Sequence, residues 1–191
     1  MSGPLPVLDL VGSPREQGLR HGAAAKDAIA ENVRTYFARF EAVGHVSRPE
    51  IHRRASAYRR VIAESNADYA AAMDGIAEGS GQELLDIVAL NVRYEILYSE
   101  FAHLGMEKAA AGPAAAGGCT AFALLPSMTA NGHLLLGQNW DWIPGVQGAF
   151  VHTREPDGLE TLGFTEAGIV GTKIGLNSTG LGLVINGLMS T

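Results

Sequence analysis

The single cysteine of the chain, Cys119, has the clearest chemical potential, because it follows Gly117-Gly118 and opens a predicted strand. A lone cysteine among apolar residues is usually buried and inert, so a structural role is the simpler interpretation. A nucleophile that follows a Gly/Ala-rich segment is, however, what a chain needs if it is to cut itself at that point. Both interpretations stay open on this residue alone.

The peptide bond between Gly118 and Cys119 is the expected cleavage site if the chain does cut itself. A free thiol has a pKa of about 8.5 and needs a base, and the α-amine of the same residue, with a pKa of about 8, can serve. That amine exists only after the bond has been broken. Attack of the thiol on the Gly118 carbonyl would break it, and glycine there offers the least steric bulk.

Two further residues are candidates for the same site. Asp141 lies in Gly137-Gln138-Asn139-Trp140-Asp141-Trp142, after the strand expected to pair with the Cys119 strand. A polar turn capped by aromatic residues explains this segment equally well. If it is functional, Asp141 would accept hydrogen bonds from the terminal amine and tune its pKa. Asn186 is a candidate oxyanion donor.

Other kinds of site are weakly supported. The glycine-rich segments 165–171 and 177–182 lack the Gly-Lys-Ser/Thr signature and the following helix of a phosphate loop. The six histidines show no metal-ligand spacing, and we expect a structural role for His21. We therefore expect neither a metal nor an organic cofactor.

The elements that must position these residues divide into a helical first part and a strand-rich second part. Ser13, Pro14 and Glu16 predict a helix start, and apolar residues spaced by three and four continue it as one helix to Val43. Further helices are predicted from Ser47, over 68–77 and over 83–103. Strands are predicted at 5–11, 119–126, 133–139, 148–154, 159–165, 169–176 and 181–187, with hairpin turns at 131–132, 157–158 and 177–180. The sequence thus predicts an α+β fold with an antiparallel sheet.

Composition narrows the function classes. With 14 basic and 20 acidic side chains, the net charge is −6, which disfavours nucleic acid as a partner. No apolar run is long enough for a membrane span and the start lacks a signal-peptide pattern, so we expect no membrane partner and a cytoplasmic location. The length of 191 residues suits one domain, and segment 104–118 is expected to be a flexible linker.

Several short stretches carry a family resemblance, and they follow one another in the family's order. They include Gly118-Cys119-Thr120 and Gly137-Gln138-Asn139-Trp140-Asp141. The others are 12–18, 21–26, 75–79, 90–93, 165–171 and 175–178. Together they resemble the acyl-coenzyme A:isopenicillin-N (aminopenicillanic acid) acyltransferases, which belong to the N-terminal-nucleophile (Ntn) hydrolases.

This resemblance implies an Ntn αββα sandwich, of which the chain would hold the first helical layer and part of the antiparallel sheets. It implies a precursor that is cleaved into a helical α-subunit, 1–118, and the start of a β-subunit, 119–191. Cys119 would be the nucleophile, Asp141 the carboxylate that orients its amine, and Asn186 a residue near the oxyanion hole. An acyl group would pass from a thioester or amide donor to an amine through an acyl-cysteine, with acyl-coenzyme A as a possible substrate and no cofactor.

Two alternatives remain beside acyl transfer. An amidase that hydrolyses N-acyl amides would use the same nucleophile. The family also continues for about another hundred residues, so the chain is expected to be truncated, and it could be an inactive fragment or a half-enzyme that depends on a partner. Its expected partners are a small acyl donor, an amine acceptor, its own cleaved α-subunit and a missing C-terminal segment.

Overall fold

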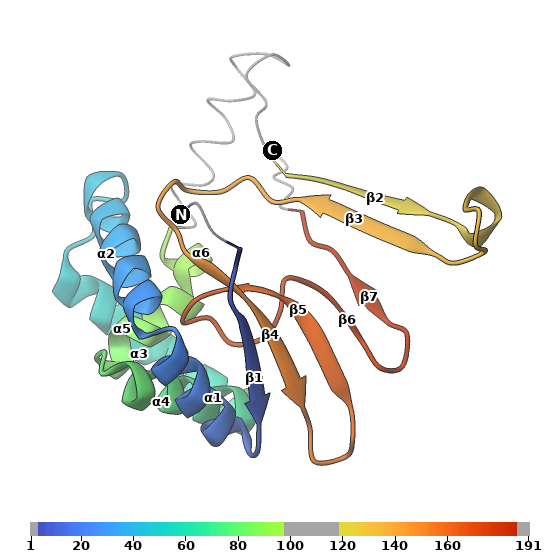
Figure 1. Cartoon of the computed structure of the whole chain (residues 1–191). Helices are drawn as coiled ribbons and strands as arrows, with labels where there is room; N and C mark the ends of the chain where they lie inside the picture. Colours follow the sequence, from blue (N-terminus) through green and yellow to red (C-terminus); the bar gives the residue numbers. More distant parts are fainter. Residues whose placement is uncertain (1–3, 98–118, 187–191) are drawn as a thin grey trace, which may run out of the picture.

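The computed structural model describes residues 4–97 and 119–186. Helices cover one face of a five-stranded sheet, and a two-stranded hairpin extends away from that sheet (Figure 1). The predicted α+β class is therefore confirmed. One helical layer and strands in two sheets are the part of the αββα sandwich that the resemblance implies for this chain.

The helical layer contains six helices among the described residues. They are α1 (Pro14–Ala24), α2 (Lys26–Ala42), α3 (Arg48–Ser65), α4 (Ala67–Ser80), α5 (Leu84–Asn91) and α6 (Arg93–Ile96). The predicted start of α1 is confirmed, because Ser13 and Glu16 form a reciprocal capping box. The predicted start at Ser47 is confirmed as the N-cap of α3.

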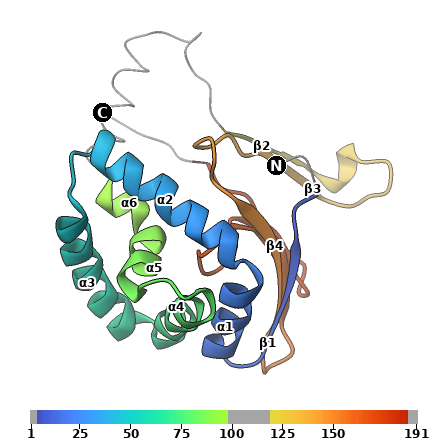
Figure 2. The ribbon, with the colours of Figure 1, turned by 60° about the vertical axis from the view of Figure 1, so that its left-hand side comes forward.

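The prediction of one helix from Pro14 to Val43 is wrong, because α1 and α2 are separated at Ala25. Glycines let α1 lie very close to α4. A Cβ atom added at Gly18 would lie 2.1 Å from the carbonyl oxygen of Ala72. A Cβ atom added at Gly75 would lie 2.1 Å from the carbonyl oxygen of Arg15. Figure 2 shows α1 beside α4, with α2 running on across the layer. Because the helix is interrupted at Ala25, α1 can pack along α4 while α2 covers the sheet.

The prediction of one helix over 83–103 is also wrong. α5 ends at Asn91 and a separate short helix, α6, begins at Arg93. The Asn91 side chain donates hydrogen bonds to the carbonyl oxygens of Ile87, at 2.8 Å, and Gly168, at 2.9 Å, which ties the end of α5 to the sheet. Residues 98–103 and the predicted linker 104–118 lie outside the described residues.

The five-stranded sheet has the order β1-β4-β5-β6-β7. Its strands are β1 (Val7–Val11), β4 (Gly148–Arg154), β5 (Glu160–Glu166), β6 (Ile174–Asn177) and β7 (Gly182–Leu183). β1 runs parallel to β4, and the other neighbours are antiparallel. The sheet is therefore mixed and not antiparallel throughout, and its edge strand comes from the helical first part of the chain.

The predicted turns are confirmed, whereas two predicted strands are too long. Gly132, Gly158 and Gly180 take positive φ angles of 70°, 88° and 89° in the three hairpin turns. The strand predicted over 169–176 begins only at Ile174. Within the described part of the strand predicted over 181–187, only Gly182–Leu183 forms a strand. Gly168 and Gly171 take φ angles of 93° and 81°, and these left-handed positions shape the turn that follows β5.

The hairpin contains β2 (Thr120–Leu124), the 3₁₀ turn η2 (Pro126–Met128) and β3 (Leu135–Asn139). β2 and β3 form a separate antiparallel sheet in which Thr120 pairs with Asn139. Large apolar side chains of this hairpin are exposed, among them Phe122, Leu125 and Met128.

The core lies between the helices and one face of the five-stranded sheet. Leu8, Leu10 and Val151 point into it from β1 and β4, whereas Val7 and Phe150 of the same strands are exposed. The alternation is what a half-buried sheet requires. The helical layer therefore covers one sheet face, and the turn after β5 enters the core beneath it.

Candidate active site

The Cys119 thiol lies directly before β2, where the hairpin register brings the residues after β3 beside it. Its Sγ atom donates a hydrogen bond to the main-chain carbonyl oxygen of Asp141 at 3.5 Å, and the residue is partly buried. The structure thus brings Cys119 and Asp141 together, through the Asp141 main chain. The role expected for the Asp141 carboxylate stays a prediction, and Gly118 lies outside the described residues.

Two tryptophans flank Asp141 and anchor it. The rings of Trp140 and Trp142 stack with their centroids 5.9 Å apart. Trp140 also packs against Phe164 of β5 at 4.9 Å, and the Trp142 indole N–H donates to the Tyr36 hydroxyl of α2 at 2.6 Å. The segment against which the thiol lies is therefore fixed to both the sheet and the helical layer.

Asn186 is the last described residue and is exposed. The residue before it is held in place: the Ile185 amide donates to the Gln138 side chain at 2.8 Å, and that side chain donates back to the Ile185 carbonyl. Gln138 pairs with Ala121, two positions after Cys119. The segment that carries Asn186 therefore lies against the Cys119 hairpin, and its oxyanion role stays a prediction.

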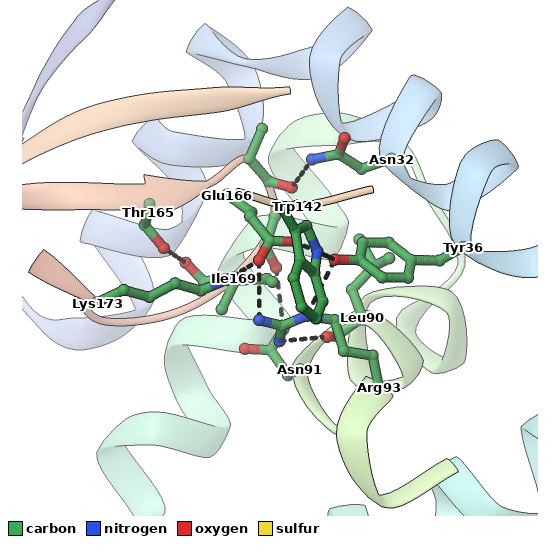
Figure 3. Close-up of polar contacts among 12 residues, drawn as sticks. Asn32, Tyr36, Leu90, Asn91, Arg93, Trp142, Thr165, Glu166, Ile169 and Lys173 are labelled. Carbon is green, nitrogen blue, oxygen red and sulfur yellow. Dashed lines mark hydrogen bonds and ion pairs between the residues drawn. The ribbon is translucent and has the colours of Figure 1, made fainter. Parts of the chain in front are cut away.

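A buried cluster of polar side chains contacts the same tryptophans (Figure 3). Its centre is Glu166, at the end of β5, whose side chain is 0% exposed. The Tyr36 hydroxyl and the Arg93 guanidinium donate to its carboxylate, the latter at 2.9 Å, and the Lys173 ammonium forms an ion pair with it. Tyr36, Arg93, Glu166 and Lys173 are called the Glu166 cluster below.

Each member of the Glu166 cluster comes from a different element. Tyr36 belongs to α2, Arg93 begins α6, Glu166 ends β5, and Lys173 directly precedes β6. Arg93 is 3% exposed and Lys173 is 11% exposed. With one carboxylate between two basic side chains, the cluster has a surplus positive charge when Lys173 is protonated.

Burial shifts the protonation equilibria of the cluster. Burial first, and the nearby Arg93 charge second, lower the pKa of Lys173 to about 6, although a thiolate at Cys119 acts in the opposite direction. Burial also raises the pKa of Tyr36, so its hydroxyl keeps the proton that it donates to Glu166.

The turn after Glu166 is held by side chains of three helices. The Gly168 amide donates to Nε2 of His21 at 3.1 Å. Asn91 donates to the Gly168 carbonyl and Asn32 to the Ala167 carbonyl, both at 2.9 Å. Burial lowers the pKa of His21 to about 4, so this histidine is neutral and serves as a structural acceptor.

The sequence alone does not reveal the Glu166 cluster, because segment 165–171 stands out there only as a glycine-rich stretch without the signature of a phosphate loop. One signal was available: Glu166 is a charged residue between Thr165 and Ala167, at the end of a strand that enters the core. A carboxylate in that position needs buried partners. The sequence could not show that Arg93 and Lys173 supply them.

One group of possible metal ligands is present among the described residues. His52, Glu83 and Asp86 offer ligand atoms within 4.8 Å of one another. The Asp86 carboxylate, however, already pairs with Arg48 at 2.5 Å and with His52 at 2.7 Å. An ion-pair network accounts for this group.

No helix within residues 4–97 and 119–186 is both long enough and apolar enough to cross a membrane.

No family model matches the chain. A curated protein of Emericella nidulans, the 40 kDa form of acyl-coenzyme A:6-aminopenicillanic-acid acyltransferase, is 32% identical over 179 residues. The match covers 93% of this chain and 45% of that protein, so the chain spans about half the length of its relative. The family resemblance noted in the sequence is confirmed.

Proposed function

Because the chain belongs to the family of this acyl-coenzyme A:6-aminopenicillanic-acid acyltransferase, we propose that its protein is an acyltransferase. The observation that carries the proposal is the identity of 32% along 93% of the chain. Since the match covers under half of the relative, the activity is proposed for the protein to which these residues contribute, with an acyl-coenzyme A as donor and a small amine as acceptor.

The proposed nucleophile is the Cys119 thiol. In the uncut chain it would attack the Gly118 carbonyl carbon, so that the carbon–sulfur bond forms and the carbon–nitrogen bond breaks. The leaving nitrogen takes up a proton and becomes the α-amine of Cys119, and water then hydrolyses the thioester to free the Gly118 carboxylate. The position of Cys119 directly before β2 supports this proposal, because cleavage there leaves the nucleophile as the residue that leads into a strand.

Acyl transfer would use the same sulfur atom. The free α-amine of Cys119 accepts the thiol proton, the sulfur attacks the donor carbonyl, and coenzyme A leaves with that proton. The acceptor amine then attacks the acyl-cysteine and regenerates the thiol. Asp141 is proposed to orient the α-amine, and the contact between the Cys119 thiol and the Asp141 carbonyl supports its place beside the nucleophile. Asn186 is proposed to donate to the oxyanion.

The first test is the intact mass of the purified chain after incubation at neutral pH, beside a Cys119→Ala control. Two fragments, 1–118 and 119–191, are expected for the unaltered chain and one uncut mass for the control. A folded but uncut wild-type chain would contradict self-cleavage by these residues.

The second test follows acylation of the sulfur. Incubation with an acyl-coenzyme A should add one acyl mass to the 119–191 fragment, and an amine such as 6-aminopenicillanic acid should remove it. Asp141→Asn should slow acylation by about 100-fold, whereas Asp157→Asn, in an exposed hairpin turn, should not. Equal rates in the two variants would remove Asp141 from the mechanism.

A further inference from the structure

The Tyr36 hydroxyl lies between the Glu166 cluster and the segment that contacts the thiol. It is fully buried on α2, where the Trp142 indole N–H and the Arg93 Nε–H reach it at 2.6 Å and 3.2 Å. Its third contact is with the Glu166 carboxylate (Figure 3). The proposed mechanism gives this hydroxyl no role, although its contact with Trp142 leads to the residue beside the thiol.

The partners of this hydroxyl fix which groups donate and which accept. An indole N–H and a guanidinium N–H can only donate, so the Tyr36 oxygen must accept from both Trp142 and Arg93. Its single proton must therefore go to the Glu166 carboxylate. Because all three positions around the oxygen are used, the hydroxyl cannot rotate toward one partner without losing another. Its orientation toward the indole is thus fixed by the Glu166 cluster.

Trp142 connects this hydroxyl with the thiol through the main chain. Its ring is also held by Tyr94 of α6, which it meets edge-on with centroids 5.5 Å apart. The carbonyl that accepts the Cys119 thiol at 3.5 Å is that of Asp141. This carbonyl belongs to the planar peptide group that joins Asp141 to Trp142, so it cannot turn independently of the Trp142 main chain.

We propose that Tyr36 is a positioning residue for the nucleophile: its hydroxyl fixes the Trp142 indole, and with it the Asp141 carbonyl that orients the Cys119 thiol. This inference rests on the proposed function for the use of the thiol, but the state of the thiol can be measured without cleavage or acyl transfer. Tyr36 lies within 1–118, so after the proposed cleavage its hydrogen bond to Trp142 would join the two subunits.

Tyr69 offers a matched control. It is a partly buried tyrosine of the helical layer, and its hydroxyl contacts the Asn91 side chain at 3.2 Å and the Val170 carbonyl at 3.3 Å. These contacts tie α4 to α5 and to the turn after β5. Tyr69→Phe therefore removes hydrogen bonds of a similar kind from the same layer, at a place other than segment 140–142.

The test is a double-mutant cycle on the rate at which iodoacetamide alkylates the folded protein at pH 7. Cys119 is the single cysteine, so all thiol alkylation reports on it. Intact mass separates cut from uncut chains, so each form is compared only with the same form. Tyr36→Phe removes the hydroxyl and keeps the ring that fills the core. Trp142→Phe removes the indole N–H, and the two substitutions are made singly and together.

Tyr36→Phe should be alkylated about two- to tenfold faster than the wild type, because a thiol released from the Asp141 carbonyl loses a hydrogen bond that favours its protonated form. Trp142→Phe should also be alkylated faster. In the Trp142→Phe background, Tyr36→Phe should add no further change, since the hydroxyl acts through the indole. Tyr69→Phe should keep the wild-type rate.

Three results would overturn the proposal. The first is a wild-type rate in Trp142→Phe or in Tyr36→Phe, and the Trp142→Phe rate decides even if Tyr36→Phe does not fold. The second is an equal fold-change from Tyr36→Phe with and without the indole, which would show that the hydroxyl acts by another route. The third is an equal acceleration in Tyr69→Phe, which would show a general loosening of the helical layer.

The outcome is separable from that of the proposed function. A wild-type chain that is never cut would contradict self-cleavage, yet the alkylation rates would still decide the role of Tyr36. If the chain is cut, Tyr36→Phe should slow the cleavage by about tenfold and Tyr69→Phe should not, because a thiol that is no longer oriented attacks the Gly118 carbonyl less often. Cleavage of Tyr36→Phe at the wild-type rate would refute the Tyr36 proposal alone.

Discussion

Acidification should destabilise the fold through His21. This imidazole is 3% exposed, and its Nε2 atom accepts the Gly168 amide hydrogen at 3.1 Å. Protonation of Nε2 would remove the acceptor and place a charge in the core beside an N–H group. Burial accordingly lowers the pKa of His21 from 6.5 to about 4.

The direction of the effect follows from proton uptake. Above pH 7 His21 is neutral in both the folded and the unfolded chain, so it makes no pH-dependent contribution. As the pH falls through 6.5, the unfolded chain binds a proton that the folded chain does not, and the free energy of unfolding decreases. With pKa values of 6.5 and about 4, the loss is about 2 kcal/mol at pH 5 and at most about 3.4 kcal/mol at lower pH.

The assay is urea unfolding, followed by far-UV circular dichroism, at pH 7.5 and pH 5. His21→Gln keeps an acceptor near the position of Nε2 but does not titrate, so it removes the proton-linked part alone. Between the two pH values, the wild type should lose about 2 kcal/mol more of its unfolding free energy than His21→Gln. His133→Gln, in an exposed turn, serves as the control. If wild type and His21→Gln lose equal amounts, the assignment of a neutral, buried acceptor is refuted.

Two further substitutions test the packing around the site. Glu166→Gln leaves two buried basic side chains without their carboxylate, so it should lower the free energy of unfolding by about 3–5 kcal/mol. The control Glu160→Gln, at an exposed position, should change the free energy of unfolding little. Equal urea midpoints for the two variants would contradict a buried ion-pair cluster. Gly75→Ala places a Cβ atom 2.1 Å from the Arg15 carbonyl oxygen, so it should lower the free energy of unfolding by about 1–3 kcal/mol in the same assay. Ser56→Ala, on the exposed side of α3, is the control. An unchanged urea midpoint for Gly75→Ala would show that α1 and α4 can separate freely.

Local patterns predicted the parts of the fold that local chemistry determines. The capping box of Ser13 and Glu16 starts α1, and glycines in the hairpin turns take the positive φ angles that their sequence pattern requires. The hairpin register also placed Asp141 beside Cys119, because the end of β3 must lie opposite the start of β2. These features involve residues close in sequence or paired within one hairpin.

Features that depend on contacts between distant elements were missed. The break at Ala25 reflects the close approach of α1 and α4, and the parallel pairing of β1 with β4 joins residues more than a hundred positions apart. In the Glu166 cluster, the sequence separation between Arg93 and Glu166 is 73 residues. Periodicity and turn patterns describe single elements, so they cannot show which buried charges meet.

Formation of the Glu166 cluster depends on completion of the fold. Its members reach the site from α2, α6, β5 and the residue before β6, so the cluster exists only when the helical layer is docked on the sheet. In an unfolded or partly folded chain, Lys173 is solvated and its charge is screened by water.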